Sequence, residues 1–365
     1  MMYLKKLDVH GLRNLKGIQL LLSPGANLFY GQNGSGKTSL LEAIHLLGRG
    51  RSFRTRTLNP VINQEEGSCT VFGLLEKESI TLPIGVSRSR QGDFQFRVNS
   101  ESINNASTLA ETMPLLVLDS ESFHLLDGGP KYRRQYIDWG VFHVEHQYRA
   151  VWQSFRRALK QRNSLLRHDR IGDAEMSVWD QEFVGLAEQV NNFREAYLQE
   201  LIPKIQWVMS ELSSMAGLEF KHYAGWDKTK SLADILVSDR PRDVLAKVTG
   251  HGPHRADLRV RFNKQSANDV LSRGQTKILV TAMQIAQGFL FHERTGCQCL
   301  YLLDDLPSEL DLQHREKVGE LLYCLGAQTF ITGVIPEDVV STWPKEGKQI
   351  NMFHVEHGGI TPTEC

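Results

Sequence analysis

A chain of 365 residues is long for one compact core and predicts two lobes. Lysine plus arginine equal aspartate plus glutamate at 42 each, so any nucleic-acid binding has to come from local basic patches. No apolar run reaches the roughly 18 residues that span a bilayer. The N-terminus lacks a signal-peptide pattern and the five cysteines form no CxxC pair, so we expect a cytoplasmic protein without membrane contact.

The first 130 residues predict strands around one strong helix. MYLKKLDVHGL, at residues 2–12, reads as a strand with room for a bulge, and ANLFY, at residues 26–30, suits a buried strand. TSLLEAIHLLG, at residues 38–48, repeats apolar residues with helical spacing and has Gly48 as a plausible stop. Three antiparallel strands are then expected in TVFGLL, ITLPIGVS and FQFRVN.

The pattern changes over residues 131–222. Apolar residues recur at helical spacing from Tyr148 to Leu159 and from Trp179 to Leu212, which predicts two antiparallel helices of unequal length, the second kinked at Pro203. From residue 223 strand and helix signals alternate again, as is typical of a parallel α/β sheet. We therefore expect a discontinuous α/β lobe of residues 1–130 and 223–365, and a mostly helical lobe of short antiparallel arms at residues 131–222.

A phosphate-binding loop stands between the second predicted strand and the first predicted helix. GQNGSGKT matches G-x-x-x-x-G-K-[ST], whose backbone N–H groups and following helix N-terminus surround nucleotide phosphates. Lys37 is expected to reach the β- and γ-phosphates, and the Thr38 hydroxyl to bind Mg²⁺. The predicted ATP contacts from this loop are Gly31, Gln32, Asn33, Gly34, Ser35, Gly36, Lys37 and Thr38.

The stretch CLYLLDD, at residues 299–305, is an apolar strand that ends in two carboxylates. A carboxylate at the C-terminal end of a buried strand is what an ATP site needs for Mg²⁺. We expect Asp304 to be the second Mg²⁺ ligand and Asp305 to face the attacking water, so Lys37, Asp304 and Asp305 are the predicted catalytic residues. The alternative is a strand that ends in a solvated turn.

A second motif lies far downstream of the phosphate loop. LSRGQ, at residues 271–275, resembles the LSGGQ signature of ABC-type ATPases, with Arg273 in place of a glycine, and SELD at residues 308–311 resembles their D-loop. Their order along the chain is that of ABC and SMC ATPase heads, which implies an α/β fold of that class. In such heads the signature binds the γ-phosphate held by a second subunit. The resemblance therefore implies an ATP-dependent homodimer in which Ser272, Gly274 and Gln275 contact the partner's ATP.

Further blocks resemble the RecF family of bacterial recombination ATPases over nearly the whole chain: VHGLRNL, LEAIHLLGRGRSFRT, LLDGGPKYRRQYIDWG, LKQRN, GPHRADL, LSRGQ and LLDDLPSELD. A transporter ATPase would bring the loop and signature closer together, and an SMC protein would insert hundreds of coiled-coil residues. Two departures from the ABC pattern stand out. QTFITG has Thr329 and Thr332 but no switch histidine after the strand, and LLVLDSESFHLL has no Q-loop glutamine.

The family resemblance implies a function in recombinational gap repair and replication-fork recovery. It implies an ATP-driven dimer that binds gapped, duplex and single-stranded DNA, helps to load RecA with RecO and RecR, and supports the SOS response. ATP and Mg²⁺ are the implied cofactors. Because Asp305 replaces the longer catalytic glutamate of ABC enzymes, we expect weak, DNA-stimulated ATP hydrolysis that regulates release of DNA.

Basic clusters mark candidate DNA contacts at residues 49–56, 131–134 and 156–170. Contacts to phosphates would make binding independent of sequence and sensitive to salt. For the third cluster, a solvated helical face remains an open alternative. The predicted contacts are Arg51, Arg54, Arg56, Lys131, Arg133 and Arg134.

Other functions fit only parts of the sequence. A transporter-type ATP subunit that drives a membrane partner is the main alternative, and it would be indifferent to DNA. A purely structural SMC-like tether is disfavoured by the missing coiled coil. The repeated FHVEH lacks the HExxH spacing of a metalloprotease site.

Overall fold

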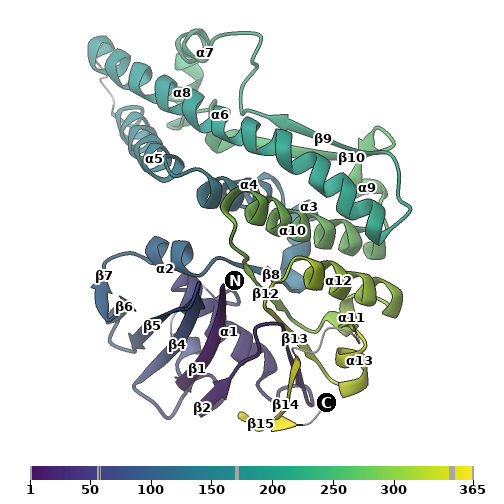
Figure 1. Ribbon diagram of the computed structural model, residues 1–365. Helices are drawn as coiled ribbons and strands as arrows, with labels where there is room; N and C mark the ends of the chain where they lie inside the picture. The colour runs from purple at the N-terminus through teal and green to yellow at the C-terminus, as the bar shows by residue number, and fades with distance from the viewer. Residues whose placement is uncertain (1, 56, 58, 169–171, 345–349, 364–365) are drawn as a thin grey trace. The chain divides into compact units, whose positions relative to one another are not determined.

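The computed structural model describes residues 2–55, 57, 59–168, 172–344 and 350–363, in two compact units (Figure 1). Unit 1 comprises Met1–Ser122, Val208–Ser213 and Lys277–Cys365, and unit 2 comprises Phe123–Trp207 and Ser214–Thr276. No helix of the part described is long and apolar enough to cross a membrane.

A largely parallel sheet forms one layer of unit 1, in the order β15-β14-β3-β13-β12-β8. Its strands alternate with helices along the chain, as the sequence pattern predicts, and the neighbouring inner strands β12 and β13 are buried throughout. Among these described strands only β15 runs antiparallel, as the return strand of a hairpin. The bounds are β3 Ala26–Tyr30, β8 Leu115–Leu118, β12 Leu300–Leu303, β13 Thr329–Gly333, β14 Ile350–Glu356 and β15 Gly359–Thr363.

An antiparallel sheet forms the other layer, in the order β2-β1-β4-β5-β6-β7. Buried and accessible residues alternate along β4, as a half-buried strand requires. The bulge for which the sequence leaves room lies between Leu4 and Lys6. The bounds are β1 Met2–Leu12, β2 Leu15–Leu21, β4 Ser68–Lys77, β5 Ile80–Ser89, β6 Phe94–Val98 and β7 Glu101–Ile103.

Helix α1, Lys37–Arg49, contacts both sheets of unit 1 through β1, β4, β5 and β13. Its apolar stripe is fully buried in one core with residues of the two sheets. The helix ends at Gly50 in a left-handed cap, not at Gly48. Gly48 lies inside the helix, where a Cβ would come within 2.5 Å of the Leu115 side chain. Further helices of this unit are α2 Ala106–Thr112, α11 Leu306–Glu309, α12 Leu312–Cys324, α13 Pro336–Val340 and, from Lys277 onward, α10 Arg273–Thr295.

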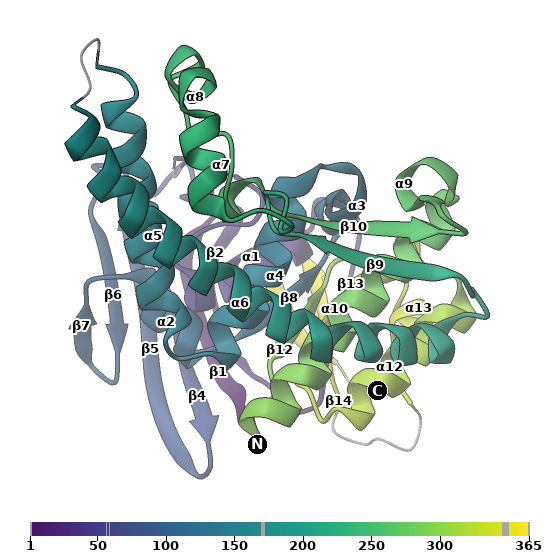
Figure 2. The same cartoon turned by 90° about the horizontal axis from the view of Figure 1, so that it is seen from above.

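Unit 2 is built around two antiparallel helices, α5 Tyr148–Leu165 and α6 Asp173–Leu212, the last five residues of α6 belonging to unit 1 (Figure 2). Tyr148 stacks edge-on against Phe193, and Phe155 packs on Phe183 with ring centroids 5.4 Å apart. The helix α6 runs through Pro203 without a break. Further helices of this unit are α3 His124–Asp127, α4 Pro130–Val144, α7 Leu232–Ser238, α8 Arg240–Ala246 and α9 Ala267–Val270.

A small antiparallel sheet also belongs to unit 2, in the order β11-β10-β9. Its strands are β9 Leu218–Tyr223, β10 Asp257–Phe262 and β11 Gln265–Ser266. The sequence pattern placed residues 223–276 in the ATPase lobe, whereas the structure groups all of them with the arms in unit 2. The reason is strand pairing, because β10 pairs with β9 and packs against α4 instead of joining the parallel sheet.

Candidate nucleotide-binding site

The phosphate loop joins β3 to α1 through three glycines with positive φ, namely Gly31 at 154°, Gly34 at 79° and Gly36 at 122°. Glycine adopts such angles at little cost, whereas other residues are strained there. A Cβ on Gly31 would lie 2.2 Å from the Val355 carbonyl oxygen, so the loop also passes too close to β14 for a side chain. The backbone of β14 therefore supports the start of the loop.

Two donors hold the Ser35 carbonyl oxygen from outside the loop. The Asn14 side-chain amide donates to it at 3.1 Å, and the Gly358 backbone N–H donates at 2.8 Å. Gly358 stands in the β14–β15 turn at a φ of 81°, where a Cβ would collide with the Asn14 carbonyl oxygen. The sequence assigned neither residue to the nucleotide site, although Asn14 lies in the VHGLRNL block and HGG between two strands is a hairpin signal.

Lys37 lies folded across the loop. Its ammonium donates to the carbonyl oxygens of Gly31 at 2.6 Å and Gln32 at 2.9 Å. Burial lowers the pKa of Lys37, and the nearby charges of Asp305 and Asp304 oppose that shift. A cation held this way can exchange its carbonyl partners for phosphate oxygens.

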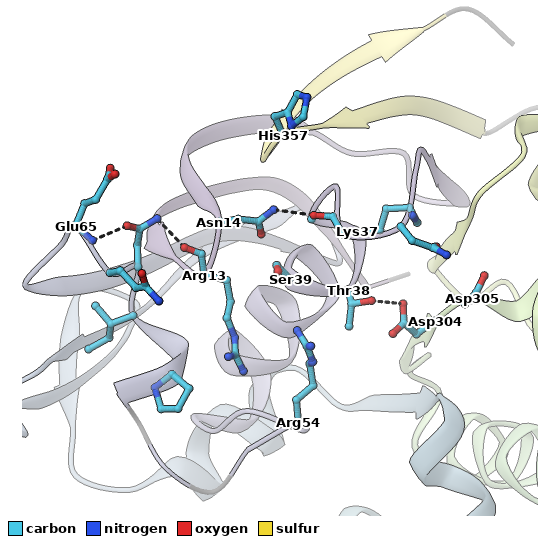
Figure 3. Close-up of a pocket in the computed structure, with 17 residues that line it drawn as sticks. Arg13, Asn14, Lys37, Thr38, Ser39, Arg54, Glu65, Asp304, Asp305 and His357 are labelled. Carbon is cyan, nitrogen blue, oxygen red and sulfur yellow. Dashed lines mark hydrogen bonds between the residues drawn. The ribbon is translucent and has the colours of Figure 1, made fainter.

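Thr38 and Asp304 meet although they are far apart in sequence. The Thr38 hydroxyl donates to Asp304 Oδ1 at 3.0 Å, which joins the start of α1 to the end of β12 (Figure 3). Burial raises the pKa of Asp304, while hydrogen bonds from Thr332 and Thr38 favour the ionised form. One hydroxyl and one carboxylate fit Mg²⁺, which is usually held by one or two carboxylates together with waters and nucleotide phosphates.

Asp305 has an unusual backbone for a residue with a side chain. Its φ of 51° and ψ of 41° are left-handed, a conformation that is uncommon outside glycine and is often found at functional sites. Its Oδ1 is buried and accepts no hydrogen bond from the described residues. This oxygen is therefore free to accept one from a ligand or a water molecule.

These groups line one cavity of about 780 Å³ in unit 1. The turn at Asn63 forms part of its wall, since Asn63 donates to the Arg13 carbonyl oxygen at 2.6 Å and accepts from the Glu65 N–H. The complete lining is Arg13, Asn14, Asn33, Gly34, Gly36, Lys37, Thr38, Ser39, Arg54, Pro60, Ile62, Asn63, Gln64, Glu65, Asp304, Asp305 and His357. Of the predicted loop contacts, Gly31, Gln32 and Ser35 shape the loop without lining the cavity.

Arg54, predicted as a DNA contact, lines the same cavity. Its guanidinium lies 3.7 Å from Glu42, a fully buried carboxylate that Arg13 also contacts with two hydrogen bonds of 2.8 Å. The positive charge of Arg54 also acts on Asp304. Arg54 therefore lies at the candidate nucleotide cavity. Arg51 is exposed, and Arg56 lies outside the described residues.

The second cluster of predicted DNA contacts is mostly engaged within unit 2. Arg133 donates twice to the Asp257 carboxylate, at 2.7 and 3.2 Å, and once to the Leu126 carbonyl oxygen. Arg134 donates to the Ala256 carbonyl oxygen at 2.7 Å, and burial lowers its pKa. Both arginines thus stabilise the packing of α4 on β10, whereas Lys131 is exposed.

The signature residues do not line the nucleotide cavity of their own chain. Ser272 and Gly274 are exposed where α10 begins, and a Cβ added to Gly274 would meet nothing within 4 Å. The D-loop contacts the same helix, because the Lys277 ammonium lies 2.6 Å from the Glu309 carboxylate. Lys277 is the first residue of α10 that belongs to unit 1.

Asp119 is a further buried carboxylate that the sequence pattern missed. It follows β8, the parallel neighbour of β12, and Leu118 accepts a hydrogen bond from the Asp304 N–H. Burial raises the pKa of Asp119, and the charge of Asp304 raises it further. Asp119 therefore lies at the C-terminal end of β8, in the stretch LLVLDSESFHLL, which has no Q-loop glutamine.

The fold and the site together define a P-loop ATPase head of the SMC class. The model of the family described as "RecF/RecN/SMC N terminal domain" matches residues 3–360. The SMC head domain of Pyrococcus furiosus shares the fold, with a TM-score of 0.60 at 15% identity over 100% of this chain and 96% of the other.

The chain belongs to the RecF family. It is 46% identical over 363 residues to the "DNA replication and repair protein RecF" of Pseudomonas aeruginosa (strain LESB58), covering 99% of this chain and 98% of that protein. Identity to the protein of the same name from Pseudomonas syringae pv. syringae (strain B728a) is 48%, covering 99% of both. A solved structure described as "recombination mediator protein RecF-ATP in RecFOR pathway" matches with a TM-score of 0.87 at 26% identity, over 100% of this chain and 98% of that chain.

Proposed function

We propose that this chain is an ATP-dependent DNA-binding clamp of recombinational gap repair and replication-fork recovery. Two copies close around two ATP molecules, bind gapped, duplex or single-stranded DNA in the cytoplasm, and help to load RecA together with RecO and RecR, which supports the SOS response. Full-length similarity to DNA replication and repair proteins supports this function over that of a transporter ATP subunit.

The observation that carries the proposal is the presence of a glycine, Gly274, at an exposed position in the first turn of α10. A glycine in a helix costs about 0.5–1 kcal/mol relative to alanine unless something requires it. Nothing in the part of the chain that the structure describes requires it, since a side chain there would meet no atom within 4 Å. Close approach of a group from outside explains the glycine, and the γ-phosphate bound to a second copy is such a group. Ser272 and Gln275 flank the same exposed turn.

ATP binding rests on the cavity in unit 1. Lys37 and the loop N–H groups would hold the phosphates, and Arg54 would add a second positive charge. Thr38 and Asp304 would hold Mg²⁺, which when bound neutralises phosphate charge. Asp305 would accept a hydrogen bond from the attacking water through its unpaired Oδ1. Because an aspartate reaches less far than a glutamate, hydrolysis should be slow, and we propose that DNA stimulates it.

DNA contact is best supported on α5. Arg156, Arg157, Lys160 and Arg167 line a hollow of about 400 Å³ together with Leu159 and Asn163, and none of these described lining residues is acidic. Arg156 also lies over the Trp152 ring. Arg51 and Lys131 are exposed additional candidates. Contacts of this kind are made to phosphates and carry no base sequence information.

The test of the clamp is to measure assembly and DNA affinity with ATP, with ADP and without nucleotide. Lys37→Met should weaken ATP binding itself, because the phosphates lose their cation. Ser272→Arg should bind ATP as the unmodified chain does but fail to dimerise. Equal DNA affinity in all nucleotide states, or monomers at saturating ATP and Mg²⁺, would contradict the proposal.

The α5 surface is tested by charge reversal. Lys160→Glu should weaken binding to duplex DNA of any sequence, and it should lower the slope of log K against log salt by about 1 for each DNA phosphate that the variant no longer neutralises. Lys230→Glu, an exposed charge reversal elsewhere in unit 2, is the control. If Lys160→Glu has unchanged DNA affinity at low salt, the proposal that α5 contacts DNA is wrong.

A further inference from the structure

One buried hydroxyl contacts both carboxylate-bearing residues of the site. Thr332, in β13, is fully buried. Its Oγ1 donates to Asp304 Oδ1 at 2.8 Å and accepts from the Asp305 backbone N–H at 2.8 Å. A threonine hydroxyl has one proton to give and lone pairs to receive. The Asp304 bond uses that proton, and the Asp305 bond uses a lone pair.

The position of Thr332 follows from strand pairing. β12 and β13 are parallel neighbours, with Leu303 opposite Ile331. The residue after Ile331 therefore comes beside Asp304, where β12 ends. This is the strand after which the sequence shows no switch histidine. The same Asp304 oxygen accepts the Thr38 hydroxyl at 3.0 Å, so two hydroxyls hold it from different sides.

The bond to the Asp305 amide controls the turn. Asp305 has a left-handed backbone, which a residue with a side chain adopts only when its surroundings hold it. Thr332 supplies that partner for its N–H. The conformation of this turn sets the direction of the Asp305 carboxylate. Asp305 lines the nucleotide cavity, and its Oδ1 has no partner among the described residues.

We propose that Thr332 is the positioning residue for ATP hydrolysis in this chain: its hydroxyl sets the Asp304 carboxylate for the metal and the Asp305 carboxylate for the water. Thr332 acts through these two residues and touches neither nucleotide nor metal. The inference rests on the proposed ATPase function of the same cavity.

Thr329 offers a matched control on the same strand. It is also fully buried, but its hydroxyl donates to the Ala327 carbonyl oxygen at 3.1 Å and contacts neither aspartate. Valine replaces threonine with nearly the same shape and no hydroxyl. Thr329→Val and Thr332→Val therefore remove the same group from the same strand, and only Thr332→Val removes it from the site. Thr332→Ser keeps the hydroxyl and removes a methyl group.

The experiment measures kcat and KM for ATP hydrolysis by the full chain with duplex DNA and excess Mg²⁺. It also measures the affinity for a fluorescent ATP analogue with and without Mg²⁺, and the midpoint of thermal unfolding. Thr332→Val should lower kcat about 10- to 100-fold, the range found when an outer partner of a metal ligand is removed. Its metal-free nucleotide affinity should change little, whereas its affinity in Mg²⁺ should fall and its KM should rise in parallel, because KM follows Kd when hydrolysis is slow. Thr332→Ser should retain most of the activity, and Thr329→Val should hydrolyse ATP as the unmodified chain does.

Three outcomes would overturn the inference. They are an unchanged kcat in Thr332→Val, an equal loss of kcat in Thr332→Ser and Thr332→Val, and an equal loss in Thr329→Val. Failure of the proposed function would look different, because the unmodified chain would then hydrolyse no ATP.

Discussion

Ser272 and Gln275 cap each other at the start of α10. The Ser272 backbone N–H donates to Gln275 Oε1 at 2.9 Å, and the Gln275 backbone N–H donates to Ser272 Oγ at 3.2 Å. This reciprocal arrangement is a capping box, and it satisfies N–H groups that would otherwise point at solvent. A phosphate arriving at this helix end therefore has to share or replace those partners.

Gly274→Ala separates folding from assembly at this turn. The backbone there is helical and a methyl group would meet none of the described residues, so the variant should be more stable by about 0.4–1 kcal/mol. It should nevertheless lose ATP-dependent dimerisation, because the methyl group blocks the approaching γ-phosphate. Urea unfolding and sedimentation velocity with ATP measure the two effects. A variant that dimerises normally would rule out close approach at Gly274.

Asn14→Ala should weaken ATP binding by removing support from the phosphate loop. The Asn14 bond to the Ser35 carbonyl oxygen is worth about 1 kcal/mol, which corresponds to roughly a fivefold increase in Kd. Asn351→Ala is the control, since that side chain donates to the Leu21 carbonyl oxygen away from the loop. Isothermal titration with ATP compares the two, and equal affinities would count against a supporting role for Asn14.

Arg162→Met should unfold unit 2 more easily. The fully buried guanidinium donates to Asp180 at 2.7 Å and to Asp243 at 2.7 Å, so its removal takes a charged partner from both carboxylates, although Asp180 keeps its bond from Arg240. Loss of one member of a buried ion pair costs about 3–5 kcal/mol. Arg157→Met, on the exposed side of the same helix, should change stability by about 0.5 kcal/mol or less. Urea denaturation measures both, and similar midpoints would contradict this account.

His254 should make the protein less stable in mild acid. Burial lowers its pKa from 6.5 to about 4, while its hydrogen bond to the Thr249 carbonyl oxygen opposes the shift. Below pH 6.5 the unfolded chain binds a proton that the folded chain refuses until about pH 4. Stability therefore falls as pH drops through this window, by up to about 1.4 kcal/mol per unit.

His254→Gln removes this titration and keeps an N–H donor for Thr249. The unfolding midpoint of this variant should fall less between pH 7 and pH 5 than that of the unmodified chain, even if packing against Phe155 and Phe183 is weakened. His168→Gln, at an exposed histidine, should leave the pH dependence as it was. Identical slopes in all three proteins would show that His254 does not contribute.

Local patterns predicted much of the fold because the relevant contacts are local. The apolar run at residues 26–30, the glycine loop and the periodic helix follow one another directly, and the structure has them as β3, loop and α1. The double aspartate was predicted for the same reason, because it ends its own strand. Alternating strand and helix signals after residue 223 were also expected, but the pairing of β10 with β9 was not, since pairing is decided between distant segments.

Basic clusters in the sequence indicated candidate DNA contacts, but not which groups each arginine contacts in the folded chain. Arg133 and Arg156 look alike as members of basic clusters. In the folded chain Arg133 is paired with Asp257, 124 positions away, whereas Arg156 lines an open hollow on α5. Arg54, a member of the first basic cluster, lines the candidate nucleotide cavity.

The sequence by itself determined the candidate chemical groups of this protein: a loop with a phosphate-binding motif, a strand that ends in carboxylates, and a turn that resembles the ABC signature. Their order along the chain is that of an ATPase head. Each of these features is one continuous segment, so its backbone geometry is decided by residues next to it in the chain. Only the tertiary structure decided which groups hold them in place, namely Asn14 and Gly358 at the loop and Thr332 at the aspartates. Hydrogen bonds act over about 3 Å, and no local pattern shows which distant residues folding brings within that reach.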